Sequence, residues 1–260
     1  MKDLILKTLK EIEEKENIKI ILAVESGSRA WGFESPDSDY DVRFIYVRTE
    51  EDYLRLDEPR DVIELPISGD LDINGWDLKK ALTLMYKSNP TLMEWLSSPV
   101  VYINTESADE LRKLAVKYFY NKGGLYHYVS MAEGNYREYL KTDTVKAKKY
   151  FYVLRPILAC RWILDKKTAP PMPFNELVDA ELPEELREEV NRLLDIKMNS
   201  PEVKLIPRVD VINDYLDGSI EEIKQLAADY PAEDHEGWDH LNDYFLKTVR
   251  TNVTYGAEAH

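Results

Sequence analysis

Two acidic residues, Asp39 and Asp41, are separated by a single tyrosine and lead directly into the apolar run VRFIYV. Residues two apart on a β-strand project from the same face, so both carboxylates would point in one direction. Asp is disfavoured on strands, and two neighbouring carboxylates repel each other unless a cation lies between them. The spacing therefore predicts that both residues are catalytic acids that bind a divalent metal, with Mg²⁺ expected and Mn²⁺ as the alternative.

A turn of small residues precedes the acid pair. Gly27 and Ser28 follow the apolar run IKIILAV (18–24), and ten residues separate Ser28 from Asp39. Such a turn can offer backbone N–H groups and a hydroxyl to a phosphate. Arg29 could add a charge-assisted hydrogen bond to that phosphate, although a solvated arginine explains it equally well. Metal-binding acids beside a phosphate cradle are what metal-assisted phosphoryl or nucleotidyl transfer requires.

A third carboxylate would complete a site that holds two metal ions about 4 Å apart. The best candidate is Asp72, which lies between two apolar residues in the β-type run LDINGW (71–76). Asp77 is the alternative third ligand, although its position before LKKALTLMYKS also suits a helix cap. Arg43 shares strand parity with the acid pair, so it could neutralise the carboxylates without metal, contact phosphate or form a plain salt bridge.

The second half of the sequence carries a mixed basic and aromatic face. In VKAKKYFYVLRPILACRWILD, three residues fall at i, i+4 and i+7 and share one side of a helix: Lys148, Tyr152 and Arg155. Cations and an aromatic ring on one side could hold phosphates and stack a base, which makes these three residues candidates for nucleotide binding. A solvated side with a half-buried tyrosine is the competing explanation, and both explanations stay open.

The elements that must position these residues form two unlike halves. The first half shows a helix over 3–15, short β-type runs and a helix over 78–88. The β-type runs are 18–24, 39–48, 61–67, 71–76 and, as an edge strand, 100–104. The rest reads almost entirely as helix, at about 108–120, 124–141, 144–165, 183–198, 209–229 and 239–250. We therefore expect an α+β fold, with a catalytic domain at 1–105 and a helical domain at 106–260 that completes the cleft.

Several segments together resemble one known group of proteins. The pattern G-S-x10-D-x-D, with a later acid on a neighbouring strand, is similar to the DNA polymerase β-like nucleotidyltransferase superfamily. More narrowly, the chain resembles the predicted nucleotidyltransferases associated with RNA ligases, the RlaP or YcgL-like family. The segments that carry this resemblance, in this order, are ESGSRAWGF–SPDSDYDVRFIY, LDINGWDLKKAL, NPTLMEWLSSPVVY and KKYFYVLRPILACRW.

The resemblance implies a minimal nucleotidyltransferase fold, in which a small mixed β-sheet with packed helices is followed by a helical region. It also implies that Asp39, Asp41 and Asp72 hold two Mg²⁺ ions and that Gly27 and Ser28 bind the triphosphate of an NTP. The association with RNA ligases suggests an RNA end as the acceptor, an argument that rests on analogy alone.

The composition narrows the setting in which such an enzyme would work. The formal net charge is −15 at pH 7, so binding of long duplex DNA is not expected. Cys160 is the single cysteine, which excludes a disulfide within the chain and fits a reduced compartment. No apolar run approaches the roughly 18 residues that would span a bilayer. We therefore expect a cytoplasmic protein without a membrane partner.

These observations favour a Mg²⁺-dependent nucleotidyltransferase. It would transfer a nucleoside monophosphate from an NTP such as ATP to an acceptor hydroxyl and release pyrophosphate. The acceptor could be an RNA end, a protein or a small molecule. Two other hypotheses are a non-catalytic nucleotide-binding or regulatory module and a toxin–antitoxin component of the nucleotidyltransferase type.

Overall fold

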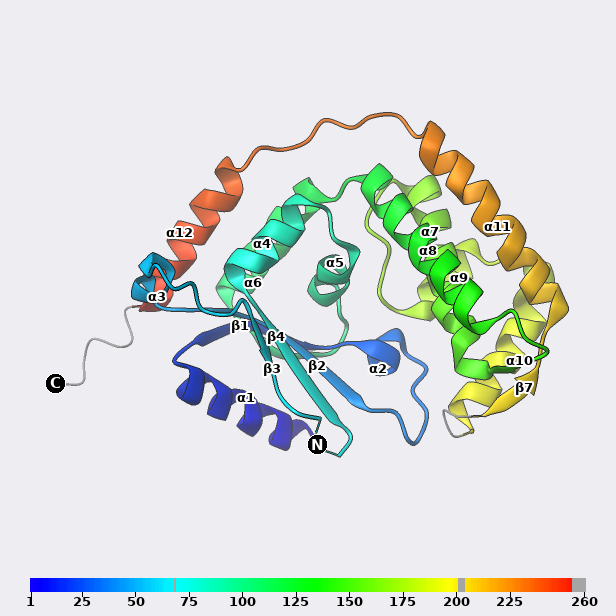
Figure 1. Cartoon of the computed structure of the whole chain (residues 1–260), viewed down its shortest axis with the longest axis horizontal. Coiled ribbons are helices and arrows are strands. Elements are labelled where there is room, and N and C mark those ends of the chain that lie inside the picture. Colours follow the sequence, from blue (N-terminus) through cyan, green and yellow to red (C-terminus); the bar gives the residue numbers. More distant parts are fainter. Residues whose placement is uncertain (68, 201–203, 254–260) are drawn as a thin grey trace.

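The first half of the chain is built around a five-stranded sheet with strand order β3-β4-β2-β1-β5 (Figure 1). The computed structural model describes residues 1–67, 69–200 and 204–253. β2 and β4 run parallel, whereas the other neighbouring pairs run antiparallel, so the sheet is mixed. The strands are β1 (Lys19–Glu25), β2 (Tyr40–Val47), β3 (Val62–Glu64), β4 (Leu71–Asp77) and β5 (Val101–Asn104).

Helices cover both faces of this sheet. They are α1 (Lys2–Glu16), α2 (Gly27–Trp31), α3 (Glu50–Leu54), α4 (Leu78–Tyr86), α5 (Pro90–Leu96) and α6 (Glu106–Ala115). Phe44 of β2 is buried in the cluster that includes α1, whereas Ile45 and Val47 are buried in the cluster that includes α4, α5 and α6. Because side chains alternate along a strand, Asp41 and Arg43 lie on the same face as Ile45 and Val47. The charged end of β2 and its apolar end therefore share one face.

The longer helices on that face begin at polar side chains that cap them. Asp77 accepts a hydrogen bond from the Lys79 N–H at the start of α4. Asn89 and Thr105 cap α5 and α6 in the same way. Each cap satisfies a backbone N–H that has no partner within its helix. The predicted cap at Asp77 is confirmed.

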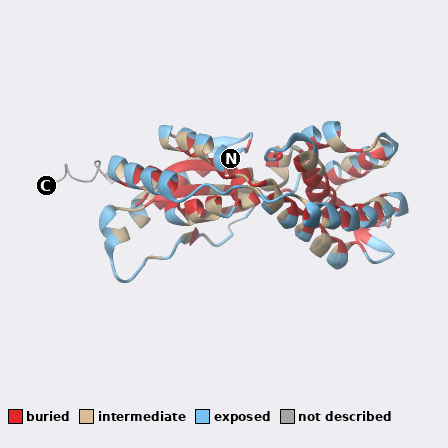
Figure 2. Cartoon of the chain, turned by 90° about the horizontal axis from the view of Figure 1, so that it is seen from above, coloured by how far each residue is buried: buried red, intermediate tan, exposed pale blue. Residues whose placement is uncertain are grey.

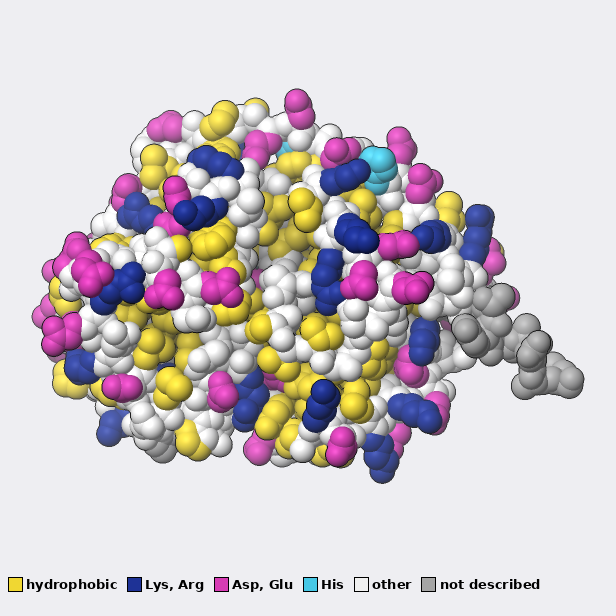
Figure 3. All heavy atoms as spheres, turned by 180° about the vertical axis from the view of Figure 1, so that it is seen from behind, with side chains coloured by type: hydrophobic (Ala, Val, Ile, Leu, Met, Phe, Trp, Pro, Cys, Tyr) yellow, Lys and Arg dark blue, Asp and Glu magenta, His cyan; other side chains and the backbone are white. Residues whose placement is uncertain are grey.

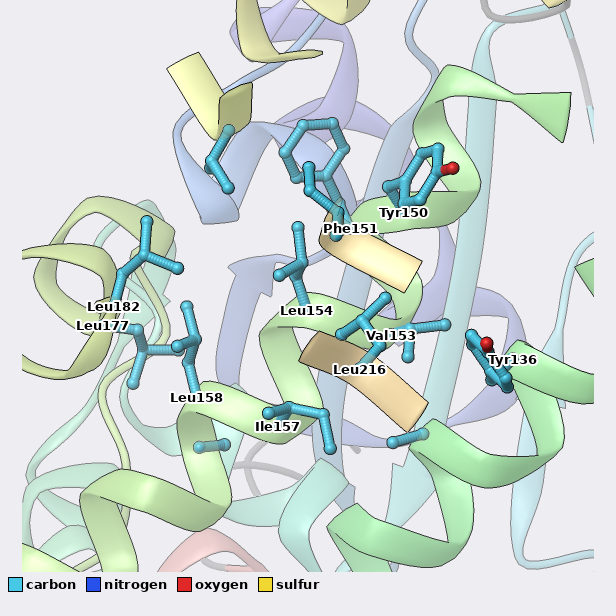
Figure 4. Packing of buried hydrophobic residues seen from close by; sticks show 14 of the residues in the cluster. Tyr136, Tyr150, Phe151, Val153, Leu154, Ile157, Leu158, Leu177, Leu182 and Leu216 are labelled. Atoms are coloured by element: carbon cyan, nitrogen blue, oxygen red, sulfur yellow. The ribbon is translucent and has the colours of Figure 1, made fainter. Parts of the chain in front are cut away.

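The second half of the chain is a helical cluster. Its helices are α7 (Asn121–Tyr139), α8 (Ala147–Lys166), α9 (Phe174–Glu181), α10 (Arg187–Met198) and α11 (Asp210–Asp229), with short 3₁₀ turns at Val116–Tyr118 and Glu184–Leu186. α8 lies at its centre and buries Phe151, Leu154 and Leu158 among its neighbours (Figure 4). A helix with apolar residues on most of its sides is stable only when other helices surround it.

Two features of this half differ from the sequence-based expectation. β6 (Thr144–Lys146) pairs antiparallel with β7 (Leu205–Pro207), where a helix was expected from residue 144. Thr144 and Val145 are β-branched, and their pairing partner lies far along the chain, so local patterns do not reveal this ribbon. α9 follows the proline-rich segment TAPPMP, where no helix was expected. With these corrections the predicted α+β class, a small mixed sheet with packed helices followed by a largely helical region, is confirmed.

Two segments connect the halves in opposite directions. Phe33, just after α2, is buried in the helical core, and its ring centroid lies 4.9 Å from that of Phe151 and 5.4 Å from that of Phe174. α12 (Asp239–Val253) returns from the helical half and packs against α4 and α6 of the sheet half (Figure 1). Figure 2 shows buried residues inside each half. The boundary at residue 105 stays a prediction, and α12 extends the sheet half with residues from the C-terminal part of the chain.

The surface carries both signs of charge. Figure 3 shows basic and acidic side chains interleaved over the face seen from behind, so positive charge is not gathered there into one surface. None of the helices in the described ranges combines the length and apolar character needed to cross a membrane.

Candidate active site

A cavity of about 200 Å³ lies between the two halves of the molecule. The sheet half contributes the wall formed by Gly27, Ser28, Trp31, Phe33, Asp39 and Asp41. The helical half contributes the opposite wall, formed by Lys148, Tyr152 and Lys197. Carboxylates, a hydroxyl, ammonium groups and aromatic rings from separate segments therefore meet in one place. This combination can bind a ligand that carries phosphates and a planar ring.

Gly27 allows an acid to approach the turn at the start of α2. Its φ of +58° lies in the left-handed region, and a Cβ atom on it would lie 2.0 Å from Asp41 Oδ2. A side chain here would therefore strain the backbone and collide with the carboxylate. The turn and the carboxylate are in contact because residue 27 has no side chain.

The backbone of Asp41 is held on both sides. Its N–H donates to Glu25 Oε1 at 2.7 Å, and its carbonyl accepts from the Ser26 N–H at 2.8 Å. Glu25 is buried, and the Tyr102 hydroxyl donates to its second oxygen. Burial raises the pKa of the Glu25 carboxyl, and its hydrogen bonds oppose that rise. Glu25 was not predicted as a site residue, yet it fixes the strand position that carries Asp41.

Arg43 lies between two of the predicted metal-binding acids. Its Nη2 donates to Asp41 Oδ1 at 3.0 Å and to Asp72 Oδ2 at 2.7 Å. Asp41 and Asp72 are direct partners in the parallel register of β2 and β4, so their side chains face a common position. Among the roles considered for Arg43, the structure shows an ion pair with these two carboxylates. Within the residues that the structure describes, no group of three or more His, Cys, Asp or Glu side chains is arranged to hold a metal ion.

Asp77, the alternative third acid, lies at the opposite end of β4 from Asp72. The Tyr53 hydroxyl donates to Asp77 Oδ2 at 3.0 Å, and the Lys79 N–H donates to Oδ1 at 2.7 Å. Burial raises the pKa of the Asp77 carboxyl to about 6. Its register partner is Tyr46 rather than Asp41. The strand register therefore places Asp72, and not Asp77, beside Asp41, and the role of Asp72 as the third acid stays a prediction.

The loop before β2 is held by Arg29. Its Nη2 donates to the Ser38 carbonyl at 2.8 Å and its Nε to the Asp39 carbonyl at 3.1 Å, while its guanidinium lies 3.8 Å from the centroid of the Tyr40 ring. The Arg29 side chain is thus engaged with the loop itself and not with the cavity. The Ser28 hydroxyl donates to Ser38 Oγ at 3.1 Å, which ties the turn to the same loop.

The three candidates on α8 separate into two environments. Lys148 and Tyr152 line the cavity, but Arg155 is only 3% exposed, and its Nη1 donates to Glu94 Oε1 at 2.7 Å. The Arg155 guanidinium also lies 4.9 Å from the centroid of the Trp31 ring, behind the cavity wall. Residues seven apart point in nearly the same direction but lie about 10 Å apart along a helix axis. At the level of Arg155 that side of α8 is covered by α5, so Arg155 is not brought to the cavity.

Three lining residues were not predicted as site residues: Trp31, Phe33 and Lys197. Trp31 and Phe33 belong to the motif ESGSRAWGF, so their closeness to Ser28 was a usable signal. Lys197 lies on α10, in a segment of mixed charge with no recognisable motif. Only the packing of α10 against the loop before β2 reveals it.

Comparison with known proteins adds an independent observation. The family model of RlaP, described as the RNA repair pathway DNA polymerase beta family, matches residues 1–247. The chain is 49% identical over 251 residues to the uncharacterized protein YcgL of Bacillus subtilis (strain 168), a match that covers 96% of each chain.

Among solved structures, a nucleotidyltransferase-like protein from Exiguobacterium sibiricum aligns with 95% of this chain and 80% of its own, at 11% identity. Its TM-score of 0.33 is too low to identify a shared fold. The family match supports a nucleotidyltransferase activity in general. Because the family model matches residues 1–247 and the chain is 49% identical to YcgL, the chain belongs to the RlaP family, a family of the DNA polymerase β type.

Proposed function

We propose that this protein is a metal-dependent nucleotidyltransferase that transfers a nucleoside monophosphate from an NTP to an acceptor hydroxyl. The observation that supports this most directly is the shared cavity. Asp39, Asp41 and the Gly27–Ser28 turn line it from the sheet half, and Lys148 and Tyr152 line it from the helical half. A nucleoside triphosphate offers the matching chemistry, because its phosphates suit metal-binding acids and cations while its base can stack on an aromatic ring.

The donor set in this region fits a hard divalent cation. All the candidate ligand atoms are carboxylate oxygens, which Mg²⁺ and Mn²⁺ prefer. The Arg43 Nη2 within 3.0 Å of Asp41 and 2.7 Å of Asp72 marks a position where the two carboxylates already face a positive charge. Asp39, Asp41 and Asp72 are not arranged as a metal site in the described part of the chain. In this proposal they would hold the metal when it binds, and the metal would neutralise phosphate charge and lower the pKa of the acceptor hydroxyl.

The other residues of the site have separate roles in this proposal. Gly27 and Ser28 hold the phosphates that leave as pyrophosphate, Lys148 adds positive charge, and Tyr152 stacks on the base. Asp41 or Asp72 accepts the proton of the acceptor hydroxyl. The acceptor oxygen forms a bond to the α-phosphorus, and the bond from this phosphorus to the bridging oxygen of the β-phosphate breaks.

An RNA end is the acceptor that we propose first. The description of the matching family names an RNA repair pathway, and a single strand end requires fewer phosphate contacts than a duplex. This fits a chain with a formal net charge of −15. A protein side chain and a small molecule are the other acceptors to test.

The test is nucleotide transfer by the purified full chain. The protein is incubated with Mg²⁺, each of the four α-labelled NTPs and short RNAs with a free 3′ hydroxyl, and both labelled product and pyrophosphate are measured. The double variant Asp39→Asn/Asp41→Asn should lose transfer, whereas Asp70→Asn, which removes an exposed acid two residues before Asp72, should keep it. Equal transfer by the wild type and the double variant would refute the proposal.

The Arg43 ion pairs favour one other candidate, a nucleotide-binding module without catalysis. They neutralise two acids without metal, which a module of this kind would retain permanently. Calorimetry with ATP in Mg²⁺ and in EDTA separates the candidates. A non-catalytic module would bind ATP equally in both solutions and release no pyrophosphate.

A further inference from the structure

A second cavity lies between the halves of the molecule, apart from the candidate active site. Its volume is about 440 Å³, and none of its described lining residues lines the first cavity. α5, α6 and the short turn after α6 form one side, and residues 167–169, directly after α8, form the other. A cavity of this size between separate elements is typical of a small-molecule site. We call it the second cavity.

The wall of the second cavity is mainly apolar. The residues that give it this character come from α5, α6 and the turn after α6, and they are Met93, Leu96, Ala115, Val116 and Phe119. Met93 and Leu96 are each only 6% exposed, whereas Val116 is 80% exposed. The apolar wall therefore continues from the protein interior to the surface. An apolar group that enters the cavity would remove this surface from water, which favours binding.

The charged residues that line the second cavity, in the part of the chain that the structure describes, are Arg112 and Lys167. Both are basic, although the whole chain has a formal net charge of −15. The Lys167 ammonium donates to the Leu164 carbonyl and lies 5.2 Å from the centroid of the Tyr230 ring. Neither of these partners carries a charge, so they leave the positive charge of Lys167 uncompensated for a ligand.

Arg112 is held in place on the other side of the second cavity. Its Nε donates to the Leu96 carbonyl at 2.8 Å, and its Nη1 donates to Asn104 Oδ1 at 2.6 Å and to Asp109 Oδ1 at 3.1 Å. The Asp109 carboxylate offsets part of the Arg112 charge, but its side chain is 55% exposed, so water screens the pair. Nη2 takes part in none of these hydrogen bonds and can donate to a ligand.

We propose that the second cavity binds a small organic anion with an apolar body, such as a medium-chain or aromatic carboxylate. The apolar body would lie against Met93, Leu96 and Phe119, and the anionic group would accept hydrogen bonds from Arg112 and Lys167. This inference does not depend on nucleotide transfer, because it concerns a separate set of residues. A ligand that contacts both sides of the cavity would also stabilise the folded state.

The test compares ligands that carry one or both of these features. Octanoate and 2-naphthoate combine an anion with an apolar body that is flexible in one and planar in the other. Acetate lacks the apolar body, and octanamide lacks the charge. Isothermal titration calorimetry on the full chain should show one site for octanoate, for 2-naphthoate or for both. Acetate and octanamide should bind at least about tenfold more weakly, and the better carboxylate should raise the midpoint of thermal unfolding.

Two variants with matched controls place the binding in the second cavity. Lys167→Met removes a lining charge, whereas Lys166→Met removes the charge of an exposed neighbour that does not line the cavity. Val116→Asp adds an acid to the wall, and Val211→Asp adds one at another exposed valine, on α11. Lys167→Met and Val116→Asp should each weaken carboxylate binding by about five- to tenfold, and the controls by no more than about twofold. Thermal unfolding without ligand checks that each variant is folded.

Several results would overturn the inference. A wild type that binds neither carboxylate refutes it directly, and equal affinity for octanoate and octanamide shows that the lining cations are not used. Unchanged affinity in both Lys167→Met and Val116→Asp places the ligand elsewhere. A wild-type dimer that Val116→Asp separates in analytical ultracentrifugation would assign the second cavity to another copy of the chain. Nucleotide transfer has its own assay, so each of these results leaves the proposed function standing.

Discussion

The sheet wall and the helical wall of the cavity carry opposite charges and support them in different ways. Asp41 of the sheet wall is fixed through its backbone, which is hydrogen-bonded to Glu25 and Ser26, and through its register with Asp72. The helical wall presents longer side chains, Lys148 and Tyr152, from the surface of α8. A strand register fixes short acids to within a fraction of an ångström, whereas long side chains can adjust to a ligand. This difference fits the proposed function, in which the reacting groups lie on the sheet and the groups that hold the ligand come from helices.

Two arginines, Arg43 and Arg155, form ion pairs in different surroundings. Arg43 pairs with Asp41 and Asp72, whose side chains are partly exposed, at 29% and 33%. Arg155 pairs with Glu94 in the interior between α8 and α5. In the proposed function the first pair would exchange its partners for a bound cation and phosphate, whereas opening the second pair would leave charged groups in the interior. The predictions below test this division from the largest expected effect to the smallest.

The acids of the sheet wall should dominate activity without supporting the fold. Asp39→Asn/Asp41→Asn should lower nucleotide transfer by at least about a thousandfold, or about 4 kcal/mol in activation free energy, because two of the proposed metal ligands are lost. The midpoint of thermal unfolding should change little, because Asp39 is exposed and Asp41→Asn keeps an oxygen that can accept from Arg43. Transfer and unfolding are measured on the same preparation. Large destabilisation together with the loss of activity would show that these acids serve the fold.

Arg155 should show the opposite behaviour. Arg155→Met removes the charged partner of the Glu94 carboxylate, which is only 13% exposed, so the free energy of unfolding should fall by about 3 kcal/mol. Urea denaturation measures this change. Arg161→Met is the control on the same helix, because the Arg161–Glu222 pair is partly exposed and should contribute at most about 1 kcal/mol. A stable Arg155→Met with weakened ATP binding would return Arg155 to the nucleotide site.

Gly27→Ala should disturb the contact between the turn and Asp41. The new Cβ would collide with Asp41 Oδ2, so transfer should fall by about ten- to a hundredfold as the carboxylate is displaced. Gly32→Ala is a matched control, because Gly32 has a φ of +85° and no atom within 4 Å of the added Cβ. Both variants should lose about 1 kcal/mol of stability from the left-handed backbone. Equal activity in the two variants would show that the contact at residue 27 is unimportant.

Asp77 provides a test of buried charge in the sheet half. Because burial raises its pKa to about 6 in the folded protein, the folded state binds a proton more readily than the unfolded state. The stability that this proton binding adds is fully present below the unfolded pKa and is lost as the pH rises through about 6.

Asp77→Asn keeps a side-chain oxygen that can cap α4 but cannot ionise. Relative to the wild type, its free energy of unfolding should therefore rise by about 1–1.5 kcal/mol between pH 5 and pH 7.5. Urea denaturation at several pH values measures the difference, and Asp70→Asn serves as an exposed control. Parallel stability curves for Asp77→Asn and the wild type would contradict the raised pKa.

Much of the sheet half could be read from local patterns. The alternation of side chains predicted β2 and β4, and the apolar run 18–24 predicted β1. Asp77 was recognisable as the residue that caps α4. The short spacing between Ser28 and Asp39 was sufficient to bring both to one cavity, because the strands that flank them are adjacent in the sheet. In the helical half, periodicity located the helices but not the β6–β7 ribbon, because the pairing of distant segments leaves no local trace.

The sequence by itself determined which chemical groups this protein carries near the Gly27–Ser28 turn, because residue type and strand parity are local properties. Only the tertiary structure decided which distant side chains join them. It buried Arg155 against Glu94 and brought Lys197 of α10 to the serines of the loop before β2. Both outcomes depend on which helix covers which side of its neighbour, and that is set by packing over the whole chain rather than by any pattern within one segment.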